Sequence, residues 1–136
     1  MTHSALILGS GFVATPAVEV LSKAGIAVTV ACRTLVSAQK LAGEHSNTKA
    51  ISLDVSDSAA LEAEVARHDI TISLIPYTFH VAVIKAAIKA KKNVVTTSYV
   101  SPAMQELHEE AKAAGITVMN EIGVCFQWFS LHRTAC

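Results

Sequence analysis

A short apolar strand that runs directly into a glycine turn constrains the fold of this chain more than any other feature. Residues 5–8 read Ala-Leu-Ile-Leu, a continuous apolar run that stops at Gly9, as expected of a strand buried on both faces. The turn Gly9-Ser10-Gly11-Phe12-Val13-Ala14 follows, and apolar residues then recur at helical spacing as far as Gly25. A glycine turn between a first strand and a first helix is typical of α/β domains that bind dinucleotides.

Strand-like and helix-like segments alternate along the rest of the chain. Further strands are expected at residues 26–31, 50–53, 70–75, 93–97 and 116–119, and helices at 12–24, 35–44, from 59 onward, 79–90 and 102–114. Parallel strands joined by helices form right-handed crossovers. Residues 1–123 are therefore predicted to form one Rossmann-type α/β domain, a doubly wound parallel sheet of about six strands in the order 3-2-1-4-5-6.

Composition and charge narrow the classes of partner. The apolar fraction is 51%, the net charge is +0 and the pI is about 7.0, so neither nucleic acid nor a strongly charged partner is indicated. No apolar stretch approaches the roughly 20 residues of a membrane span, and no secretory signal opens the chain. Cys32, Cys125 and Cys136 have no metal or redox spacing, which fits a cytoplasmic location. The scattered histidines predict no metal site.

The glycine turn is expected to hold a pyrophosphate. Gly9 allows a tight exit from the strand, Gly11 lets phosphate approach the backbone, and Ala14 lets the helix pack closely on the strand. The helix dipole and the free amides of the first helical turn both attract anions. A purely structural turn that binds nothing is the alternative. The predicted pyrophosphate-binding residues are Ser10, Gly11, Phe12 and Val13.

The end of the second strand predicts which dinucleotide is bound. Sites that prefer NAD place an acidic residue here for the ribose hydroxyls, whereas this chain has Cys32-Arg33-Thr34 and no carboxylate nearby. The fork of donors on Arg33 can grip a 2′-phosphate, and Thr34 can add a hydroxyl. A solvated arginine on a loop is the alternative. The missing acid and the present base together favour NADP(H).

Candidate cofactor-binding residues also lie at the ends of the third, fourth and fifth strands. Asp54 is predicted to accept a hydrogen bond from the adenine amino group while Val55 packs on the ring, although Asp54 can instead be a loop residue before the next helix. Ile75 is expected near the nicotinamide ribose. Thr97 and Ser98 lie at the mouth of the crevice where open α/β sheets bind ligands; the alternative for this segment is helix capping by Ser98 or Ser101.

Two further residues leave alternatives open. His80 follows the fourth strand and can either face a substrate or simply begin a helix without a catalytic role. Glu121 follows the sixth strand at the same edge and can either orient a substrate amine or be a loop acid. No residue is assigned as a catalytic acid or base.

Six segments together form a more specific pattern than the glycine turn alone. They are Gly9-Ser10-Gly11-Phe12-Val13-Ala14, Ala31-Cys32-Arg33-Thr34, Leu53-Asp54-Val55, Ser73-Leu74-Ile75-Pro76-Tyr77, Thr97-Ser98-Tyr99-Val100-Ser101-Pro102 and Met119-Asn120-Glu121-Ile122-Gly123. The pattern resembles the fungal saccharopine reductases, also called saccharopine dehydrogenases (NADP+, L-glutamate-forming). This family reduces the imine of α-aminoadipate semialdehyde and glutamate to saccharopine with NADPH, in lysine biosynthesis.

The resemblance implies a role for each site segment. It places the pyrophosphate at residues 10–13. It also implies that full-length members of the family are homodimers. It places the adenosine phosphate at Cys32, Arg33 and Thr34, the adenine at Asp54 and Val55, the ribose at Ile75, other parts of the cofactor at Thr97 and Ser98, and the amino-acid substrate at Tyr99 and Val100.

The chain departs from the family after residue 123. A substrate-binding and dimerising domain is expected there, and an atypical tail, residues 124–136, stands in its place. We therefore expect a truncated form that binds cofactor but turns over poorly; a short paralogue is the alternative. A non-catalytic NAD(P)-binding regulatory domain, such as those of potassium transport, is a competing hypothesis that Arg33 disfavours. Another NADP-dependent reductase of unspecified substrate is a third.

Overall fold

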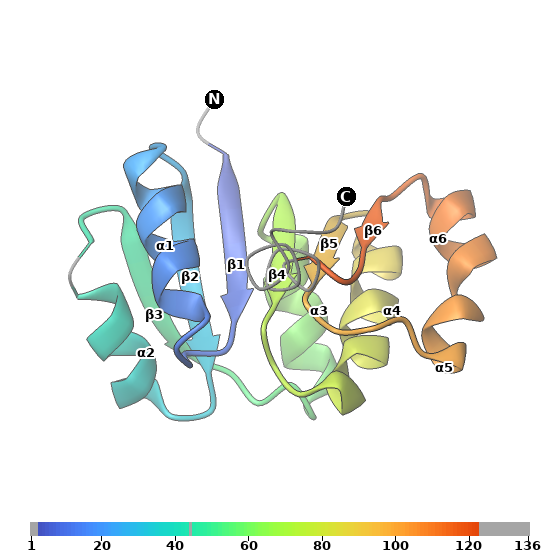
Figure 1. The fold of residues 1–136 in the computed structure, drawn as a ribbon, viewed down its shortest axis with the longest axis horizontal. Helices are drawn as coiled ribbons and strands as arrows, with labels where there is room; N and C mark the ends of the chain where they lie inside the picture. The colour runs from blue at the N-terminus through green and yellow to red at the C-terminus, as the bar shows by residue number, and fades with distance from the viewer. Residues whose placement is uncertain (1–2, 44, 123–136) are drawn as a thin grey trace, which may run out of the picture.

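The computed structural model describes residues 3–43 and 45–122, which form one six-stranded sheet flanked by helices (Figure 1). Every adjacent pair of strands is parallel, and the order is β3-β2-β1-β4-β5-β6, as predicted. The strands are β1 (Ser4–Leu8), β2 (Ala27–Cys32), β3 (Thr48–Ser52), β4 (Ile70–Ser73), β5 (Asn93–Thr96) and β6 (Val118–Met119). The expected tail, residues 124–136, lies outside the described residues.

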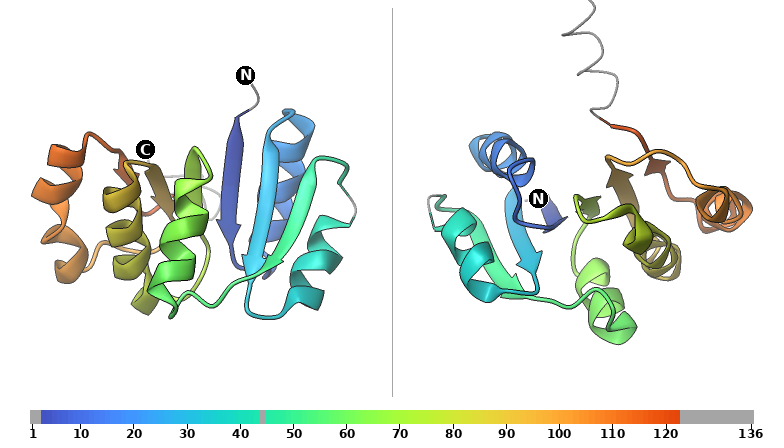
Figure 2. Two further views of the ribbon diagram at one scale, coloured as in Figure 1. Left: turned by 180° about the vertical axis from the view of Figure 1, so that it is seen from behind. Right: turned by 60° about the horizontal axis from the view of Figure 1, so that its bottom comes forward.

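Helices cover both faces of the sheet (Figure 2). One face carries α1 (Ala14–Lys23) and α2 (Leu35–Ala42). The other face carries α3 (Ser58–Ala66) and α4 (His80–Ala90), and a 3₁₀ turn, η1 (Tyr77–Phe79), precedes α4. Two short helices, α5 (Pro102–Gln105) and α6 (His108–Ala114), pack against α4 near β6. This is the doubly wound arrangement that the alternating sequence predicts.

The alternating side chains of β1 divide the core into two layers. Leu6 and Leu8 are fully buried against α3 and α4, while Ile7 is fully buried on the opposite side with Val18 of α1. Burying a Leu, Ile or Val side chain stabilises a fold by about 1.5–3 kcal/mol. Because both faces of the strand are covered from residue 5 onward, residues 5–8 of β1 must be apolar, as their sequence is.

The largest difference from the sequence prediction is a break in the helix expected at residues 102–114. The amide of Leu107 donates to the Met104 carbonyl at 3.2 Å, three residues back instead of four, and ψ of Leu107 is 1°. Both Met104 and Leu107 are buried in the core beside Ile84 of α4. Packing of these two side chains decides the local geometry over helix propensity.

Other element boundaries shift by a few residues. The strands expected at 70–75 and 93–97 end at Ser73 and Thr96, and the strand expected at 116–119 is shortened to two residues. The helix expected to end at residue 44 ends at Ala42. Asp57 caps α3, because its carboxylate accepts from the amides of the second and third residues beyond it at 3.1 Å.

Within the described part of the chain, none of the helices has both the length and the apolarity needed to cross a membrane. The same residues contain no group of three or more His, Cys, Asp or Glu side chains that could hold a metal ion.

Candidate functional site

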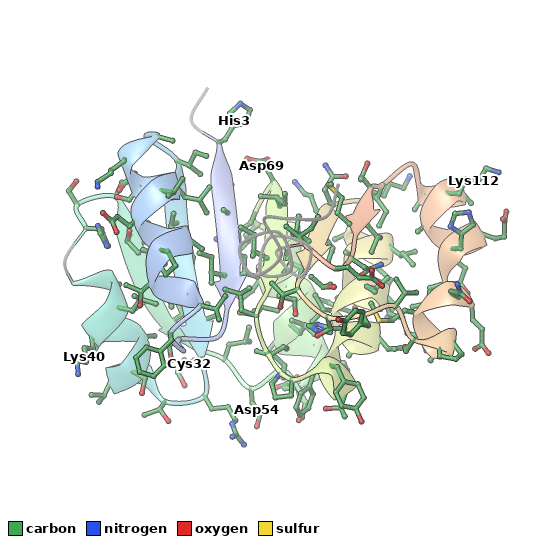
Figure 3. The ribbon with its side chains drawn as sticks, in the orientation of Figure 1. His3, Cys32, Lys40, Asp54, Asp69 and Lys112 are labelled. Atoms are coloured by element: carbon green, nitrogen blue, oxygen red, sulfur yellow. The ribbon has the colours of Figure 1, made fainter. Side chains whose placement is uncertain are left out.

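The carboxyl ends of the strands gather the predicted site residues at one edge of the sheet. Figure 3 shows Cys32 and Asp54 at this edge and His3 and Asp69 at the opposite edge. Since all six strands are parallel, the segments that follow β1 to β6 meet there. The strand order reverses between β1 and β4, and such switch points are where open α/β sheets bind ligands.

The glycine turn has the geometry that a phosphate cradle requires. Gly9 has φ of 111°, and a Cβ there would lie 3.1 Å from the Leu74 carbonyl oxygen, so this position needs glycine. A Cβ on Gly11 would meet nothing within 4 Å, so its backbone faces open space. Ala14, which begins α1, is 1% exposed and packs in the core, as the turn motif requires. The fit to a pyrophosphate is therefore good.

The N-terminus of α1 has free capacity for an anion. Val13, at the N-cap, makes no side-chain capping bond, and the first turn carries no acidic residue. The first amides of a helix have no intrahelical partner and sit at the positive end of the helix dipole. Phe12, in the turn itself, is 99% exposed.

A cavity of about 220 Å³ joins the glycine turn to the ends of β2, β3 and β4. It brings together five of the residues predicted to contact the adenosine and ribose moieties. A second hollow, about 310 Å³, lies on the other side of the turn and is lined by Ser10, Gly11, Phe12, Thr15, Ser37, Lys40 and Leu41. The first cavity is lined by Gly9, Ala31, Cys32, Arg33, Leu53, Asp54, Val55, Ser56, Ile75, Pro76 and Phe79.

The charges in this cavity are arranged to keep a guanidinium available. Arg33 is exposed and forms no ion pair with any residue of the described ranges. The Ser56 amide donates a hydrogen bond to the Asp54 carboxylate at 2.9 Å, and the Ser56 hydroxyl donates a second one. The amide bond, then the hydroxyl bond and finally the nearby Arg33 guanidinium lower the pKa of Asp54. Asp54 is thus a loop residue that precedes α3, and it also lines the cavity.

Cys32, the last residue of β2, and the two residues after it are held by hydrogen bonds to the backbone carbonyls of Arg33 and Thr34. The Ser52 hydroxyl donates to the Arg33 carbonyl at 3.0 Å, and the Cys32 thiol donates to the Thr34 carbonyl at 2.8 Å. Thr34 precedes α2 without a side-chain capping bond and does not line the cavity. Thr34 is therefore the one residue of this segment that the cavity does not include.

His80 holds the ends of β4 and β5 together, a role that the sequence does not suggest. Its side chain is fully buried, with Nδ1 2.9 Å from the Ser73 hydroxyl and Nε2 2.8 Å from the Ser98 hydroxyl. Burial lowers the pKa of His80, so the imidazole is neutral near pH 7. Ser101, not Ser98, caps the following helix. Ser73 is a site residue that sequence reasoning missed; its only signal is a serine at the end of an apolar strand.

Glu121 ties the segment after β5 to the segment after β6. Its carboxylate accepts from the Val100 amide at 3.1 Å, and its own amide donates to the Ser98 carbonyl at 3.1 Å. Its φ of 62° is unusual for a non-glycine residue. The buried hydroxyl of Thr96 donates to Asn120 at 2.9 Å. Tyr99, which directly precedes Val100, is exposed.

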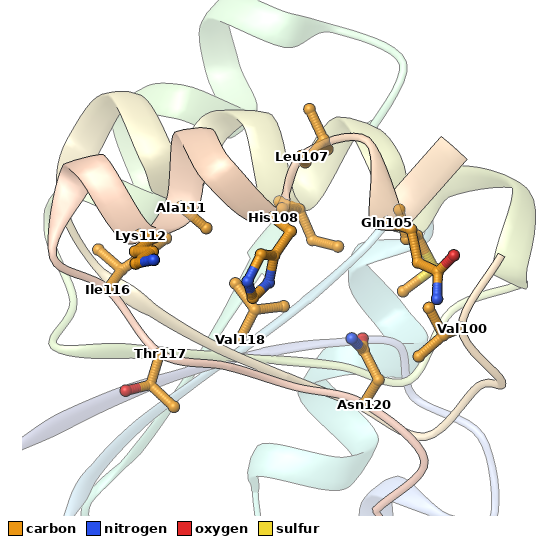
Figure 4. Close-up of a pocket in the computed structure, with 12 residues that line it drawn as sticks. Val100, Gln105, Leu107, His108, Ala111, Lys112, Ile116, Thr117, Val118 and Asn120 are labelled. Atoms are coloured by element: carbon orange, nitrogen blue, oxygen red, sulfur yellow. The ribbon is translucent and has the colours of Figure 1, made fainter. Parts of the chain in front are cut away.

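A third hollow, larger than the other two, lies away from the glycine turn, between α5, α6 and β6 (Figure 4). It measures about 730 Å³, and Val100 and Asn120 lie at one end of it. Val100, a predicted substrate residue, therefore does not share a cavity with the cofactor residues. Thr97 is half-buried after β5 and lines none of these cavities.

Comparison with known proteins identifies the family. Residues 5–119 match the model of the saccharopine dehydrogenase NADP binding domain. The chain is 67% identical over 123 residues to saccharopine dehydrogenase [NADP(+), L-glutamate-forming] of Pyricularia oryzae, covering 90% of this chain and 27% of that protein. It is 58% identical over 125 residues to the enzyme of the same name from Saccharomyces cerevisiae, covering 91% of this chain and 28% of that protein.

Solved structures agree with the sequence comparisons. The apo saccharopine dehydrogenase (L-Glu forming) of Saccharomyces cerevisiae superposes with a TM-score of 0.85 at 58% identity, over 89% of this chain and 27% of that one. A shikimate 5-dehydrogenase of Mycobacterium fortuitum superposes with a TM-score of 0.67 at 27% identity, over 88% of this chain and 44% of that one.

These matches confirm the resemblance predicted from the six segments. This chain spans roughly a quarter of the length of the fungal relatives, 27% and 28%. The family model covers most of the chain, from residue 5 to residue 119. The chain belongs to the saccharopine dehydrogenase NADP binding domain family.

Proposed function

We propose that this chain binds NADP(H) as the cofactor domain of a saccharopine dehydrogenase. The observation that carries the proposal is the meeting of two features at one edge of the sheet. The open backbone of Gly11 gives room for a pyrophosphate, and the Arg33 guanidinium, which forms no ion pair within residues 3–43 and 45–122, lies beside the adjoining cavity. Longer members of the family carry NADP(+) and L-glutamate in their names, which supports the same cofactor here.

The residues of this chain fit the parts of the cofactor in order along the edge. The amides of residues 10–13 hold the pyrophosphate, with Ser10, Gly11, Phe12 and Val13 contributing one each. Arg33 binds the 2′-phosphate, because a fork of guanidinium donors matches phosphate geometry. The rest of the assignment places Cys32 and Thr34 beside that phosphate, Asp54 and Val55 at the adenine, Ile75 at the ribose, and Thr97 and Ser98 towards the nicotinamide.

The nicotinamide ring supplies the hydride when the cofactor is bound. This chain positions the ring, and Tyr99 and Val100 border the substrate at the outer side of the crevice. The substrate class is an amino acid imine, formed from α-aminoadipate semialdehyde and glutamate and reduced to saccharopine. Because reaction needs the imine and the hydride donor held together, turnover requires the substrate-holding part that the longer relatives contain.

Three further assignments accompany this function. The cysteine pattern supports a cytoplasmic location. The apolar side chains exposed at the carboxyl edge, among them Tyr99 at 69% and Tyr77 at 68% exposure, suit a surface that another domain covers. Full-length members of the family are expected to be homodimers.

The proposal is tested by measuring cofactor binding and turnover separately. Isothermal titration of this chain with NADPH and with NADH should give the tighter binding for NADPH, because only NADPH carries the phosphate for Arg33. Saccharopine oxidation by the same sample should be absent or slow. Binding of neither cofactor would overturn the proposal, and a preference for NADH would point to a regulatory domain instead.

A further inference from the structure

Three side chains form a continuous hydrogen-bonded chain from the core to the crevice. Ser73 is fully buried at the end of β4, His80 is fully buried at the start of α4, and Ser98 is half-buried after β5. The imidazole bridges the two hydroxyls with distances of 2.9 and 2.8 Å. This series of hydrogen bonds therefore begins at a buried hydroxyl that solvent does not reach and ends at the proposed nicotinamide side of the site.

The burial of Ser73 decides which way the hydrogen bonds run. Within the described residues, His80 Nδ1 is the single hydrogen-bond partner of the Ser73 hydroxyl. If Nδ1 carried the proton and donated to Ser73, the serine hydrogen would remain buried without an acceptor, which is unfavourable. If Ser73 donates to a bare Nδ1, its hydrogen is satisfied. The neutral imidazole then carries its proton on Nε2.

The imidazole is held in the neutral form that this arrangement needs. Burial lowers the pKa of His80. His80 is also the first residue of α4, a helix of 11 residues, and the positive end of the helix dipole disfavours a second proton there. Its two partners are uncharged hydroxyls, so neither one favours a cation.

The direction of the bonds determines what Ser98 can do. A hydroxyl that accepts the Nε2 hydrogen turns its own hydrogen elsewhere. Ser101 caps the next helix, and Glu121 holds the backbone carbonyl of Ser98, so neither task uses the Ser98 hydroxyl. The Ser98 hydrogen is thus left for a ligand in the crevice.

We propose that His80 is a positioning residue that makes Ser98 a hydrogen-bond donor to the carboxamide oxygen of the cofactor's nicotinamide. The inference rests on the proposed function, because it takes the nicotinamide to lie beyond β4 and β5. Ser73 fixes the histidine tautomer, the tautomer fixes the polarity of Ser98, and Ser98 orients the amide of the ring. A carboxylate of the substrate is the competing acceptor for the same hydrogen.

The tautomer can be measured directly on the unmodified chain. Long-range ¹H–¹⁵N NMR spectra at pH 7 distinguish Nε2–H from Nδ1–H imidazoles. We expect His80 to be in the Nε2–H form, with a bare Nδ1. An Nδ1–H form or a charged ring would overturn the inference, whether or not any cofactor binds.

A binding experiment tests the consequence for the ligand. Ser73→Ala should weaken NADPH binding roughly 2- to 10-fold, the effect of one neutral hydrogen bond. Binding of 2′-phospho-ADP-ribose, which lacks nicotinamide, should change by less than about 2-fold, an effect too small to reflect a lost hydrogen bond. Thr71→Val is the matched control, since Thr71 is fully buried on the same strand and its hydroxyl has no partner in the described part of the chain.

The outcomes separate this inference from the proposed function. Equal losses for both ligands, or equal effects of Ser73→Ala and Thr71→Val, would overturn the positioning role. If Ser73→Ala leaves NADPH binding unchanged but weakens the binding of saccharopine, the substrate carboxylate is the acceptor and the nicotinamide assignment is wrong. If 2′-phospho-ADP-ribose does not bind the unmodified chain at all, the proposed function itself fails.

Discussion

Replacing each glycine of the turn by alanine should separate folding from cofactor binding. At Gly11 an added Cβ meets no atom within 4 Å, and its φ lies outside the left-handed region. The folded state therefore accommodates the methyl group, while the unfolded state loses conformational freedom. Gly11→Ala should raise the free energy of unfolding by about 0.4–1 kcal/mol.

The same methyl group should damage cofactor binding severely. It occupies the space through which a pyrophosphate reaches the amides of the turn. Losing one hydrogen bond to a charged group costs about 1.5–3 kcal/mol. We therefore expect the Kd for NADPH to rise roughly 10- to 150-fold in Gly11→Ala.

Gly9→Ala is the matched comparison, and it should lower the free energy of unfolding where Gly11→Ala raises it. Its φ of 111° is strained for alanine, and its Cβ would lie 3.1 Å from the Leu74 carbonyl oxygen. A strained backbone position of this kind costs about 1–3 kcal/mol, so this variant should lose stability.

Urea denaturation measures the free energy of unfolding, and calorimetric titration with NADPH measures the Kd. A folded Gly11→Ala chain that binds NADPH as tightly as the unmodified chain would refute the phosphate cradle. A Gly9→Ala chain with undiminished stability would refute the backbone geometry.

Three other perturbations test the structure around the site. Because burial lowers the pKa of His80, the unfolded chain takes up a proton on this imidazole at a higher pH than the folded chain does, so the free energy of unfolding should fall as the pH drops below about 6.5. Urea denaturation between about pH 8 and 5 measures this fall. His80→Gln should make the free energy of unfolding depend less on pH. Asp57→Ala removes the cap of α3 and should cost about 0.5–2 kcal/mol in the same assay, and an unchanged midpoint would contradict the cap. Thr71→Val removes a buried hydroxyl without a partner in the described chain, so its midpoint should stay level or rise.

The sequence predicts the fold well because the evidence is local and repeated. Each strand is a short apolar run, and glycine ends two helices at Gly25 and Gly115, with φ of 78° and 70°. The break between α5 and α6 escapes prediction because it depends on packing against α4 rather than on a local breaker. The strand ends shift for a similar reason, since pairing with neighbours decides where a ladder stops.

The candidate site is predictable where it follows the strand ends and unpredictable where it depends on tertiary contacts. Gly11, Arg33 and Asp54 follow directly from the glycine turn and the strand order. The chain from Ser73 through His80 to Ser98 joins residues 7 and 18 positions apart, and no motif spans that spacing. Only the fold brings these three side chains together.

The central claim is that Arg33 selects the phosphorylated cofactor, and the affinities of Arg33→Ala for NADPH and NADH test it most directly. Loss of a charged hydrogen bond, worth about 1.5–3 kcal/mol, predicts a roughly 10- to 150-fold rise in the Kd for NADPH and little change for NADH. Arg67→Ala is the control, because Arg67 is exposed at the opposite edge, paired with Glu64 at 2.6 Å. Equal losses for the two cofactors would contradict the account.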